Sequence, residues 1–377
     1  MNTPKKLFII WHGALFPSYR KPFWILREQY GWEVHLLAAS RWSKALPRLT
    51  RFQKAEDEPI HLHVHHPVLS FHGAFHVQPV FPWHFYRIQP DAVLVIEEPY
   101  SLMGWWVTYW CRRCVPPIPV IVFSYQDILK NYPPPFAWFE QYVLKHADRL
   151  LVSNTQGGGV IINKGYSRLW DVLPTAVNLD RFSYKEPRDR GNLFTLGYVG
   201  RLANEKGLDT LFWSLTDLTD DVRLRIVGDG PARERLHVLM RELGLQHQIA
   251  FLPAISHEEL PEFYHDLDAL VLPSKTTKNW QEQFGRVLTE AMACGVPVIG
   301  SSSGAIPEVI GDAGLIFPEG NALQLADKIQ MLIADMQLRK DLSFRGRIRV
   351  EQNYSAEKVA KKLNQHLSEV MQNAHRD

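Results

Sequence analysis

The sequence is poor in cysteine and has no long apolar run. Three cysteines among 377 residues are too few for a disulfide framework. The longest uncharged aromatic stretch, 99–111, ends at Arg112 and Arg113, well short of the ~20 apolar residues that a membrane-spanning helix needs. Low-complexity tracts are also absent, which excludes a fibrous or disordered chain. We therefore expect a folded, soluble protein of the cytoplasm.

Charge and aromatic residues are distributed unevenly along the chain. Residues 1–180 contain 18 Lys and Arg against 13 Asp and Glu, whereas the remainder contains 24 against 27. Ten of the twelve tryptophans precede residue 171. The basic front half and the acidic back half are therefore expected to face different partners. The basic residues are dispersed and no recognition module is present, so nucleic-acid binding is not expected.

Short apolar runs alternate with amphipathic stretches along the whole chain, a pattern typical of βα units around parallel sheets. At the start, Lys5 and Lys6 before an apolar run resemble a signal peptide. His12 interrupts that run and no small-residue cleavage site follows, so we expect a first buried strand. The predicted strands cover 7–11, 34–38, 93–96, 120–123, 149–152, 194–199, 223–227, 249–252, 269–272 and 298–300. The predicted helices of the front half cover 22–30, 101–113, 137–146 and 156–164.

This pattern predicts an α/β protein with two Rossmann-like, doubly wound parallel-sheet domains facing across a cleft. A segment rich in proline and charge, 173–193, is the expected linker. The expected domains are 1–178 and 179–353, with a C-terminal helix in 354–377 that packs back on the first domain. Ligands of such sheets bind beyond the carboxyl ends of the strands.

The strongest motifs follow strands of the back half. Gly200-Arg201-Leu202 leads to Lys206-Gly207, which places two cations on a loop at a helix start, where a diphosphate can bind. The next strand runs into Gly228-Asp229-Gly230-Pro231, a tight turn that resembles part of a dinucleotide fingerprint. Either motif alone is weak evidence.

A third motif extends from Glu282 to Gly295. A helix should begin near Phe284 and Gly285 and end at Gly295. Glu282 then precedes the helix and Glu290 lies inside it, about 9 Å further along by the helical rise. Two carboxylates at this separation can hold hydroxyl groups at both ends of a nucleotide sugar. A small-residue loop, 301–308, follows the next strand.

In their order and spacing, these motifs of residues 194–330 resemble the retaining glycosyltransferases of family 4, which have the GT-B fold. The resemblance implies that Arg201 and Lys206 bind the donor diphosphate and that Glu282 contacts the sugar together with the backbone at Phe284 and Gly285. It also implies that Glu290 binds the ribose. It adds a donor-binding role for the following residues: Gly200, Gly228, Leu252 and Ile255, the last two near the base.

The front half resembles this family less closely. After the first strand only Gly13 stands where many members have two glycines near the diphosphate. Gln126 stands where many members have a histidine near the transferred sugar, and a glutamine can donate hydrogen bonds but cannot act as acid or base. Glu98 follows the preceding strand, and both a ligand contact and a supporting role are open for it.

Three further features carry alternatives. His61, His63 and His65 lie on one face of a strand, where a zinc surface and a half-exposed edge strand are the two readings; we favour the second, and the resemblance implies no metal. A lone Cys-x-x-Cys, Cys111 to Cys114, is read as an ordinary helix end. The aromatic helix over 101–113 is expected to pack on the sheet, although the basic front half also suits an anionic membrane surface.

The sequence thus predicts a glycosyltransferase that moves a sugar from a nucleoside diphosphate sugar to an acceptor hydroxyl with retention, in glycan, polysaccharide or glycolipid synthesis. Its expected partners are the nucleotide-sugar donor and a glycan or lipid-linked acceptor, with no cofactor or metal. It would act in the cytoplasm, with peripheral contact at the inner face of the membrane as an option. The alternatives are a nucleotide-sugar epimerase and a non-catalytic nucleotide-sugar-binding subunit of a glycosyltransferase complex.

Overall fold

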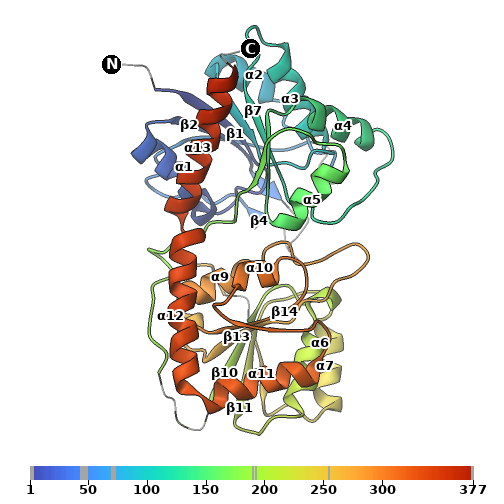
Figure 1. The fold of residues 1–377 in the computed structure, drawn as a ribbon, viewed down its shortest axis with the longest axis vertical. Coiled ribbons are helices and arrows are strands. Elements are labelled where there is room, and N and C mark those ends of the chain that lie inside the picture. Colours follow the sequence, from blue (N-terminus) through green and yellow to red (C-terminus); the bar gives the residue numbers. More distant parts are fainter. Residues whose placement is uncertain are drawn as a thin grey trace. The chain divides into compact units, whose positions relative to one another are not determined.

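A computed structural model describes residues 4–42, 50–68, 74–188, 191, 193–253 and 255–374. The chain divides into two compact units. Unit 1 comprises Met1–Ala176 together with Ala356–Asp377, and unit 2 comprises Val177–Ser355. Each unit has its own parallel sheet (Figure 1).

The described part of unit 1 forms a seven-stranded parallel sheet in the order β5-β2-β1-β6-β7-β8-β9. Its strands are β1 (Lys6–Ile10), β2 (Glu33–Ala39), β5 (His61–His65), β6 (Ala92–Val95), β7 (Val120–Ser124), β8 (Arg149–Val152) and β9 (Trp170–Val172). The short strands β3 (Arg41–Trp42) and β4 (Thr50–Arg51) form a separate antiparallel pair.

Helices cover both faces of this sheet because successive side chains of a buried strand point to opposite sides. Leu7 and Ile9 of β1 pack in one hydrophobic cluster, and Phe8 and Ile10 pack in another. The first cluster includes side chains of α1 (Pro17–Tyr30) and α13 (Ala356–Ala374). The second includes side chains of α2 (Phe81–Ile88), α3 (Leu102–Arg113), α4 (Phe136–His146) and α5 (Thr155–Asn163).

Helix α1 begins five residues earlier than the sequence predicted, at Pro17 rather than Pro22. Both prolines suit a helix start by their fixed φ, and the prediction chose the second. Pro17 occupies the first turn, where its missing N–H costs no hydrogen bond. Pro22 is accommodated inside the helix and is buried with Phe23.

Helix α13 is the last element of the chain and belongs to unit 1 (Figure 1). Its apolar side chains, among them Val359, Leu363 and Leu367, are buried in the cluster that contains β1 and α1. The indole of Trp32 also donates a 2.8 Å hydrogen bond to Asn364 Oδ1. A segment remote in sequence therefore completes one face of the first core.

Unit 2 has a six-stranded parallel sheet in the order β12-β11-β10-β13-β14-β15. The strands are β10 (Phe194–Val199), β11 (Val222–Val227), β12 (Ile249–Leu252), β13 (Ala269–Leu272), β14 (Val298–Ser301) and β15 (Leu315–Phe317). The helices are η1 (Asn204–Lys206), α6 (Leu208–Leu215), α7 (Arg233–Glu242), α8 (Leu260–His265), α9 (Arg286–Ala293), α10 (Ile306–Ile310), α11 (Ala322–Ala334) and α12 (Met336–Asn353).

All ten strands expected from apolar runs are confirmed to within one residue at each end. The prediction of two Rossmann-like parallel sheets is confirmed as well. Among the described residues, no helix combines the length and the apolar character that crossing a bilayer requires.

Candidate active site

Each sheet has one place where the strand order reverses direction. In unit 1 this switch point lies between β1 and β6, and in unit 2 it lies between β10 and β13. Ligands of doubly wound sheets bind beyond the carboxyl ends of the strands at such points. The loops that follow these four strands are therefore the first places to examine.

In unit 2, the loop after β10 holds the first predicted cations. Arg201 is exposed, and its carbonyl oxygen accepts a 2.9 Å hydrogen bond from the buried Tyr198 hydroxyl. Lys206 ends the short helix η1, and Gly207 follows with φ of 68°. A side chain at Gly207 would overlap the carbonyl oxygen of Pro273, so the glycine lets this loop approach the end of β13.

Lys206 and Glu282 are brought together at the switch point. The Lys206 ammonium lies 2.6 Å from Glu282 Oε2, and the Ser274 hydroxyl donates a 2.9 Å hydrogen bond to the same oxygen. The ammonium also lies 4.6 Å from the centre of the Trp280 ring. Glu282 is buried, so a cation beside it offsets the cost of removing the carboxylate from water. The loops after β10 and β13 thus meet through one ion pair.

Helix α9 begins as the sequence predicted, after a glycine. Gly285 caps the helix with φ of 77°, and the first turn leaves backbone N–H groups without partners inside the helix. The ring of Phe284 is buried and packs edge-on against Tyr354, with ring centres 5.5 Å apart. Only the backbone of Phe284 is therefore suited to the ligand contact expected for this residue.

Glu290, inside α9, has a separate set of partners. The Tyr264 hydroxyl donates a 2.8 Å hydrogen bond to Glu290 Oε2, and His257 Nε2 lies 3.3 Å from Glu290 Oε1. His257 Nδ1 lies 2.9 Å from a guanidinium nitrogen of Arg181. Because a guanidinium can only donate, His257 Nδ1 accepts, and the N–H of Nε2 points to Glu290. Burial raises the pKa of Tyr264 well above its usual value, which keeps the hydroxyl a donor.

His257 was missed by the sequence analysis. It lies in the loop after β12, in the segment Ser256 to Glu259. The Ser256 N–H donates a 2.7 Å hydrogen bond to Glu259 Oε2, which is the serine-to-glutamate spacing typical of a capping box before α8. That spacing was a signal that would have placed the histidine in an ordered loop at the carboxyl edge of the sheet.

The glycine turn after β11 supports the loop after β10. A side chain at Gly228 would overlap the carbonyl oxygen of Gly200, so the two loops are in contact. The N–H of Leu202 donates a 3.0 Å hydrogen bond to the Asp229 carbonyl. Leu252 and Ile255, expected near the base, are half-buried and pack against the core of unit 2.

In unit 1, an unpredicted cluster occupies the switch point. His12 follows β1, and Glu97 follows β6. Glu97 Oε2 lies 2.6 Å from His12 Nδ1 and 3.3 Å from His76 Nε2, while Oε1 accepts a 2.9 Å hydrogen bond from the His12 N–H. Trp42 packs on both imidazoles, with ring centres 4.2 and 4.8 Å away. Burial favours a neutral Glu97, but the two imidazoles outweigh it and hold the pKa of Glu97 well below its usual range.

Glu98, a predicted site residue, has different hydrogen-bond partners from its neighbour Glu97. The Ser124 hydroxyl donates to Glu98 Oε2 at 2.7 Å, and the Tyr125 N–H donates to Oε1 at 3.0 Å. These residues lie at and just beyond the end of β7. Burial raises the pKa of Glu98 to about 7. Within unit 1 the side chain therefore fixes the loop after β7, and its role toward a ligand stays a prediction.

Gln126 lies in that loop and is buried. Its amide end lies 2.9 Å from the Tyr132 hydroxyl. With the amide oriented to satisfy all its neighbours, it also meets the Lys164 ammonium at 3.0 Å and Glu140 Oε1 at 3.3 Å. Gly13 lies in the loop after β1, and its carbonyl accepts a 2.8 Å hydrogen bond from the Leu15 N–H. The ligand contacts expected for Gln126 and Gly13 stay predictions.

Part of unit 2 matches a family model, and about half of the chain matches curated relatives. The family model described as "Glycosyl transferases group 1" matches residues 181–349. D-inositol 3-phosphate glycosyltransferase of Streptomyces bingchenggensis is 32% identical over 229 residues, which make up 54% of this chain and 49% of that protein. The chain thus spans about half the length of the curated relatives it matches.

Solved structures match almost the whole chain. Sucrose-phosphate synthase of Thermosynechococcus elongatus gives a TM-score of 0.74 at 21% identity, over 98% of this chain and 100% of that one. Anabaena Alr3699/HepE in complex with UDP gives 0.73 at 18% identity, over 97% and 100%. At these identities the likeness shows the fold, which is that of the GT-B glycosyltransferases. The family model thus matches residues 181–349, and the likeness of fold extends over almost the whole chain.

Proposed function

We propose that this protein is a glycosyltransferase that moves a sugar from a nucleoside diphosphate sugar to an acceptor hydroxyl with retention, in glycan, polysaccharide or glycolipid synthesis. The observation that carries the proposal is the Lys206–Glu282 pair, at the switch point of the unit that matches the family. The UDP bound in the structurally similar Anabaena protein supports a nucleotide in this fold.

The polar groups of unit 2 suit a diphosphate. Arg201, Lys206 and the N–H groups at the start of α9 supply positive charge where the leaving diphosphate develops negative charge. These groups make a metal unnecessary for charge stabilisation in this proposal. Glu282, already oriented by Lys206 and Ser274, is placed to accept a hydrogen bond from a sugar hydroxyl.

Glu290 suits the ribose. A carboxylate offers about four acceptor positions, and Tyr264 and His257 occupy two of them. Two positions remain for the two ribose hydroxyls. Under the retaining mechanism proposed here, no side chain acts as nucleophile, and the departing phosphate oxygen takes the proton of the acceptor hydroxyl. Gln126 and Glu98 of unit 1 then serve the transferred sugar and the acceptor.

Nucleotide binding tests the donor site. Calorimetry with UDP, GDP and ADP should show binding to the wild-type chain, and Lys206→Ala and Glu290→Ala should each weaken it at least about tenfold, because each loses a hydrogen bond to a charged group. The matched control is Lys340→Ala, which removes a half-exposed lysine paired with Glu186 at 3.1 Å. Unchanged affinity in the two folded site variants would refute the donor site.

A screen of nucleotide-sugar hydrolysis without acceptor then identifies base and sugar. Release of free sugar from one donor is the result expected of a glycosyltransferase. Conversion of the donor to an isomeric nucleotide sugar would instead identify an epimerase. Binding of a donor with no turnover, with or without acceptor extracts, would identify a non-catalytic subunit.

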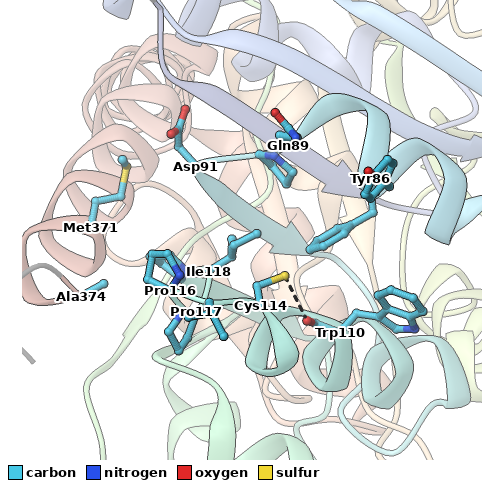
Figure 2. A pocket seen from close by; sticks show the side chains of 14 residues that line it. Tyr86, Gln89, Asp91, Trp110, Cys114, Pro116, Pro117, Ile118, Met371 and Ala374 are labelled. Atoms are coloured by element: carbon cyan, nitrogen blue, oxygen red, sulfur yellow. Dashed lines mark hydrogen bonds between the residues drawn. The ribbon is translucent and has the colours of Figure 1, made fainter.

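We also propose peripheral contact of unit 1 with an anionic membrane, at the cytoplasmic face. The supporting surface is the end of unit 1 where Trp83, Tyr86 and Val115 are 57%, 80% and 98% exposed. Arg87 and Arg113 are exposed beside aromatic rings of the same helices, α2 and α3. An adjoining cavity of about 560 Å³ is lined by prolines and aromatic rings (Figure 2).

The expectation that the aromatic helix, α3, packs on the sheet is confirmed. Fewer of its residues are therefore available for membrane contact. Trp105 and Trp106 of α3 pack against the core, and Arg112 donates hydrogen bonds to the His146 carbonyl and to Asp148. Arg112 is thus a structural residue. Tyr86→Ser with Arg87→Ser should reduce co-sedimentation with phosphatidylserine vesicles at low salt, whereas Arg223→Ser in unit 2 should not. Equal sedimentation of all three proteins would refute the contact.

A further inference from the structure

A row of imidazoles runs along one edge of the unit 1 sheet. β5 is the edge strand. Its residues His61, His63 and His65 are spaced two apart and therefore lie on one face, as expected from the sequence. His35 of the neighbouring β2 stacks on His61 with ring centres 4.5 Å apart. His84 of α2 lies 4.2 Å from His63 and 5.0 Å from His65 by the same measure.

One end of this row also has a carboxylate. Glu33 Oε1 lies 2.8 Å from His35 Nε2. A nitrogen of each of His35 and His61 and an oxygen of Glu33 all lie within 4.8 Å of one another. The other nitrogen of His35, Nδ1, lies 3.1 Å from His63 Nε2.

We propose that Glu33, His35 and His61 form a binding site for a divalent transition-metal ion such as Zn²⁺. His63 would not touch the ion but would accept a hydrogen bond from His35. Two imidazoles and one carboxylate are a ligand set that suits zinc and its neighbours among the transition metals. Three protein ligands leave a fourth position open to water. The site lies in unit 1, apart from the residues proposed to bind the donor in unit 2.

Coordination requires only small movements of these side chains. Tetrahedral bonds of about 2.0 to 2.1 Å place neighbouring ligand atoms roughly 3.3 Å apart. Glu33 and His35 are already closer than this, and the exposed His61 ring can turn to meet them. With a metal on Nε2, His35 holds its proton on Nδ1 and donates it to His63 Nε2, the outer hydrogen bond that orients most metal-binding histidines.

The surroundings hold these side chains in place and leave the site open to solvent. His35 is buried, and its Nδ1 lies 3.1 Å from His63 Nε2. Lys6 is a cation near the site, and its ammonium donates a 3.2 Å hydrogen bond to the Ile88 carbonyl. Glu33 is 30% exposed at its side chain, which gives an ion a route from solvent.

Titration of the full, EDTA-treated chain with Zn²⁺ tests the proposal. We expect one ion bound per chain, and with Co²⁺ as the probe we expect the visible absorption of a four-coordinate site. His61→Ala and Glu33→Gln should each weaken Zn²⁺ binding by at least about tenfold, the effect typical of losing even an outer partner. Zn²⁺ should raise the unfolding midpoint of the wild type and leave that of His61→Ala unchanged.

Three controls locate the ion. His247→Ala removes an exposed imidazole that pairs with Asp220 at 3.0 Å in unit 2, and it should bind Zn²⁺ like the wild type. His65→Ala and His12→Ala should also leave affinity unchanged, which separates the site from the far end of the row and from the cluster around Glu97. Because His61 is exposed, its variant should fold and bind nucleotide normally. No saturable Zn²⁺ binding, or equal binding by His61→Ala, would overturn the proposal without bearing on the donor site.

Discussion

At the switch point of unit 2 an ammonium meets a buried carboxylate, whereas at that of unit 1 two imidazoles meet one. The first pair joins the Lys206 ammonium to the Glu282 carboxylate at 2.6 Å, and under the proposed function it lies beside the donor diphosphate. The second, around Glu97, is built from imidazoles, whose ordinary pKa lies close to neutrality. Similar sheet topologies thus hold different electrostatic environments.

Under the proposed function, this difference predicts which half of the reaction each unit serves. A positive charge stabilises an anionic leaving group. Imidazoles and a carboxylate suit hydroxyl groups, to which they can both donate and accept. We therefore expect substitutions in unit 2 to alter donor binding and substitutions in unit 1 to spare it.

The largest effect is expected from Lys206→Ala on turnover. Removing a single group that stabilises developing negative charge typically lowers kcat by about 10² to 10³. Single-turnover rates at saturating donor measure this loss, with Lys340→Ala as the matched lysine control. A rate within a few-fold of the wild type would show that Lys206 does not stabilise this charge. It would contradict the role that the comparison gives to unit 2.

The next effect separates the neighbours Glu97 and Glu98 by their pH dependence. Burial raises the pKa of Glu98 from 4.5 to about 7, so its contribution to the unfolding free energy decreases as pH rises through that window. The pKa of Glu97 is lowered, so its contribution is fully present above 4.5 and is lost as pH falls below that value. The contributions of the two carboxylates to the unfolding free energy thus change with pH in opposite directions.

Urea unfolding from pH 4 to 8 checks these signs. The stability difference between wild type and Glu98→Gln should shrink as pH rises from 5 to 7. The difference between wild type and Glu97→Gln should be flat over that range and shrink only at more acidic pH. Parallel curves for the two variants would show that the imidazoles do not distinguish the two positions.

A smaller effect is expected from Tyr264→Phe in unit 2. The variant leaves Glu290 Oε2 without its buried 2.8 Å donor, and losing a hydrogen bond to a charged group costs about 1.5 to 3 kcal/mol. Thermal unfolding and nucleotide calorimetry should both register the change. Tyr354→Phe is the matched control, because its hydroxyl donates to backbone carbonyls, Val309 at 3.3 Å and Glu308 at 3.5 Å, rather than to a carboxylate. Equal losses in the two variants would contradict a special role for Glu290.

The smallest effect is expected from Gln126→Ala in unit 1. One hydrogen bond between neutral groups contributes about 0.5 to 1.5 kcal/mol, so the rate should decrease roughly two- to tenfold while nucleotide affinity stays unchanged. Steady-state rates with nucleotide calorimetry decide the matter. A loss of nucleotide affinity would instead assign part of the donor site to unit 1.

The donor-side features were largely predictable because each motif directly follows a buried strand. Strand ends are marked by apolar runs and glycines, so Lys206, Glu282 and Glu290 were placed on the correct loops and helix from the sequence. Their pairing was not predictable. The sequence does not say that Lys206 closes on Glu282 rather than pointing to solvent, since the contact joins two loops 76 residues apart.

The cluster around Glu97 in unit 1 was not found from the sequence because its residues, too, are far apart along the chain. His12 and Glu97 lie 85 residues apart, and no periodic pattern links them. In the sequence His12 appears only as an interruption of an apolar run, and Glu97 only as the neighbour of Glu98. Strand order brings them together, because β1 and β6 are adjacent in the sheet although α1, β2 to β5 and α2 lie between them along the chain. Strand order is a property of the whole fold.

The placement of α13 has a consequence for the order in which the chain acquires its structure during synthesis. Unit 2 is one continuous segment, so its core can close as soon as residue 355 has been made. Unit 1 begins first, yet side chains from Val359 to Met371 belong to its core. The core of unit 1 is therefore completed only after α13 has been made, and until then α1 covers that face of the sheet only in part.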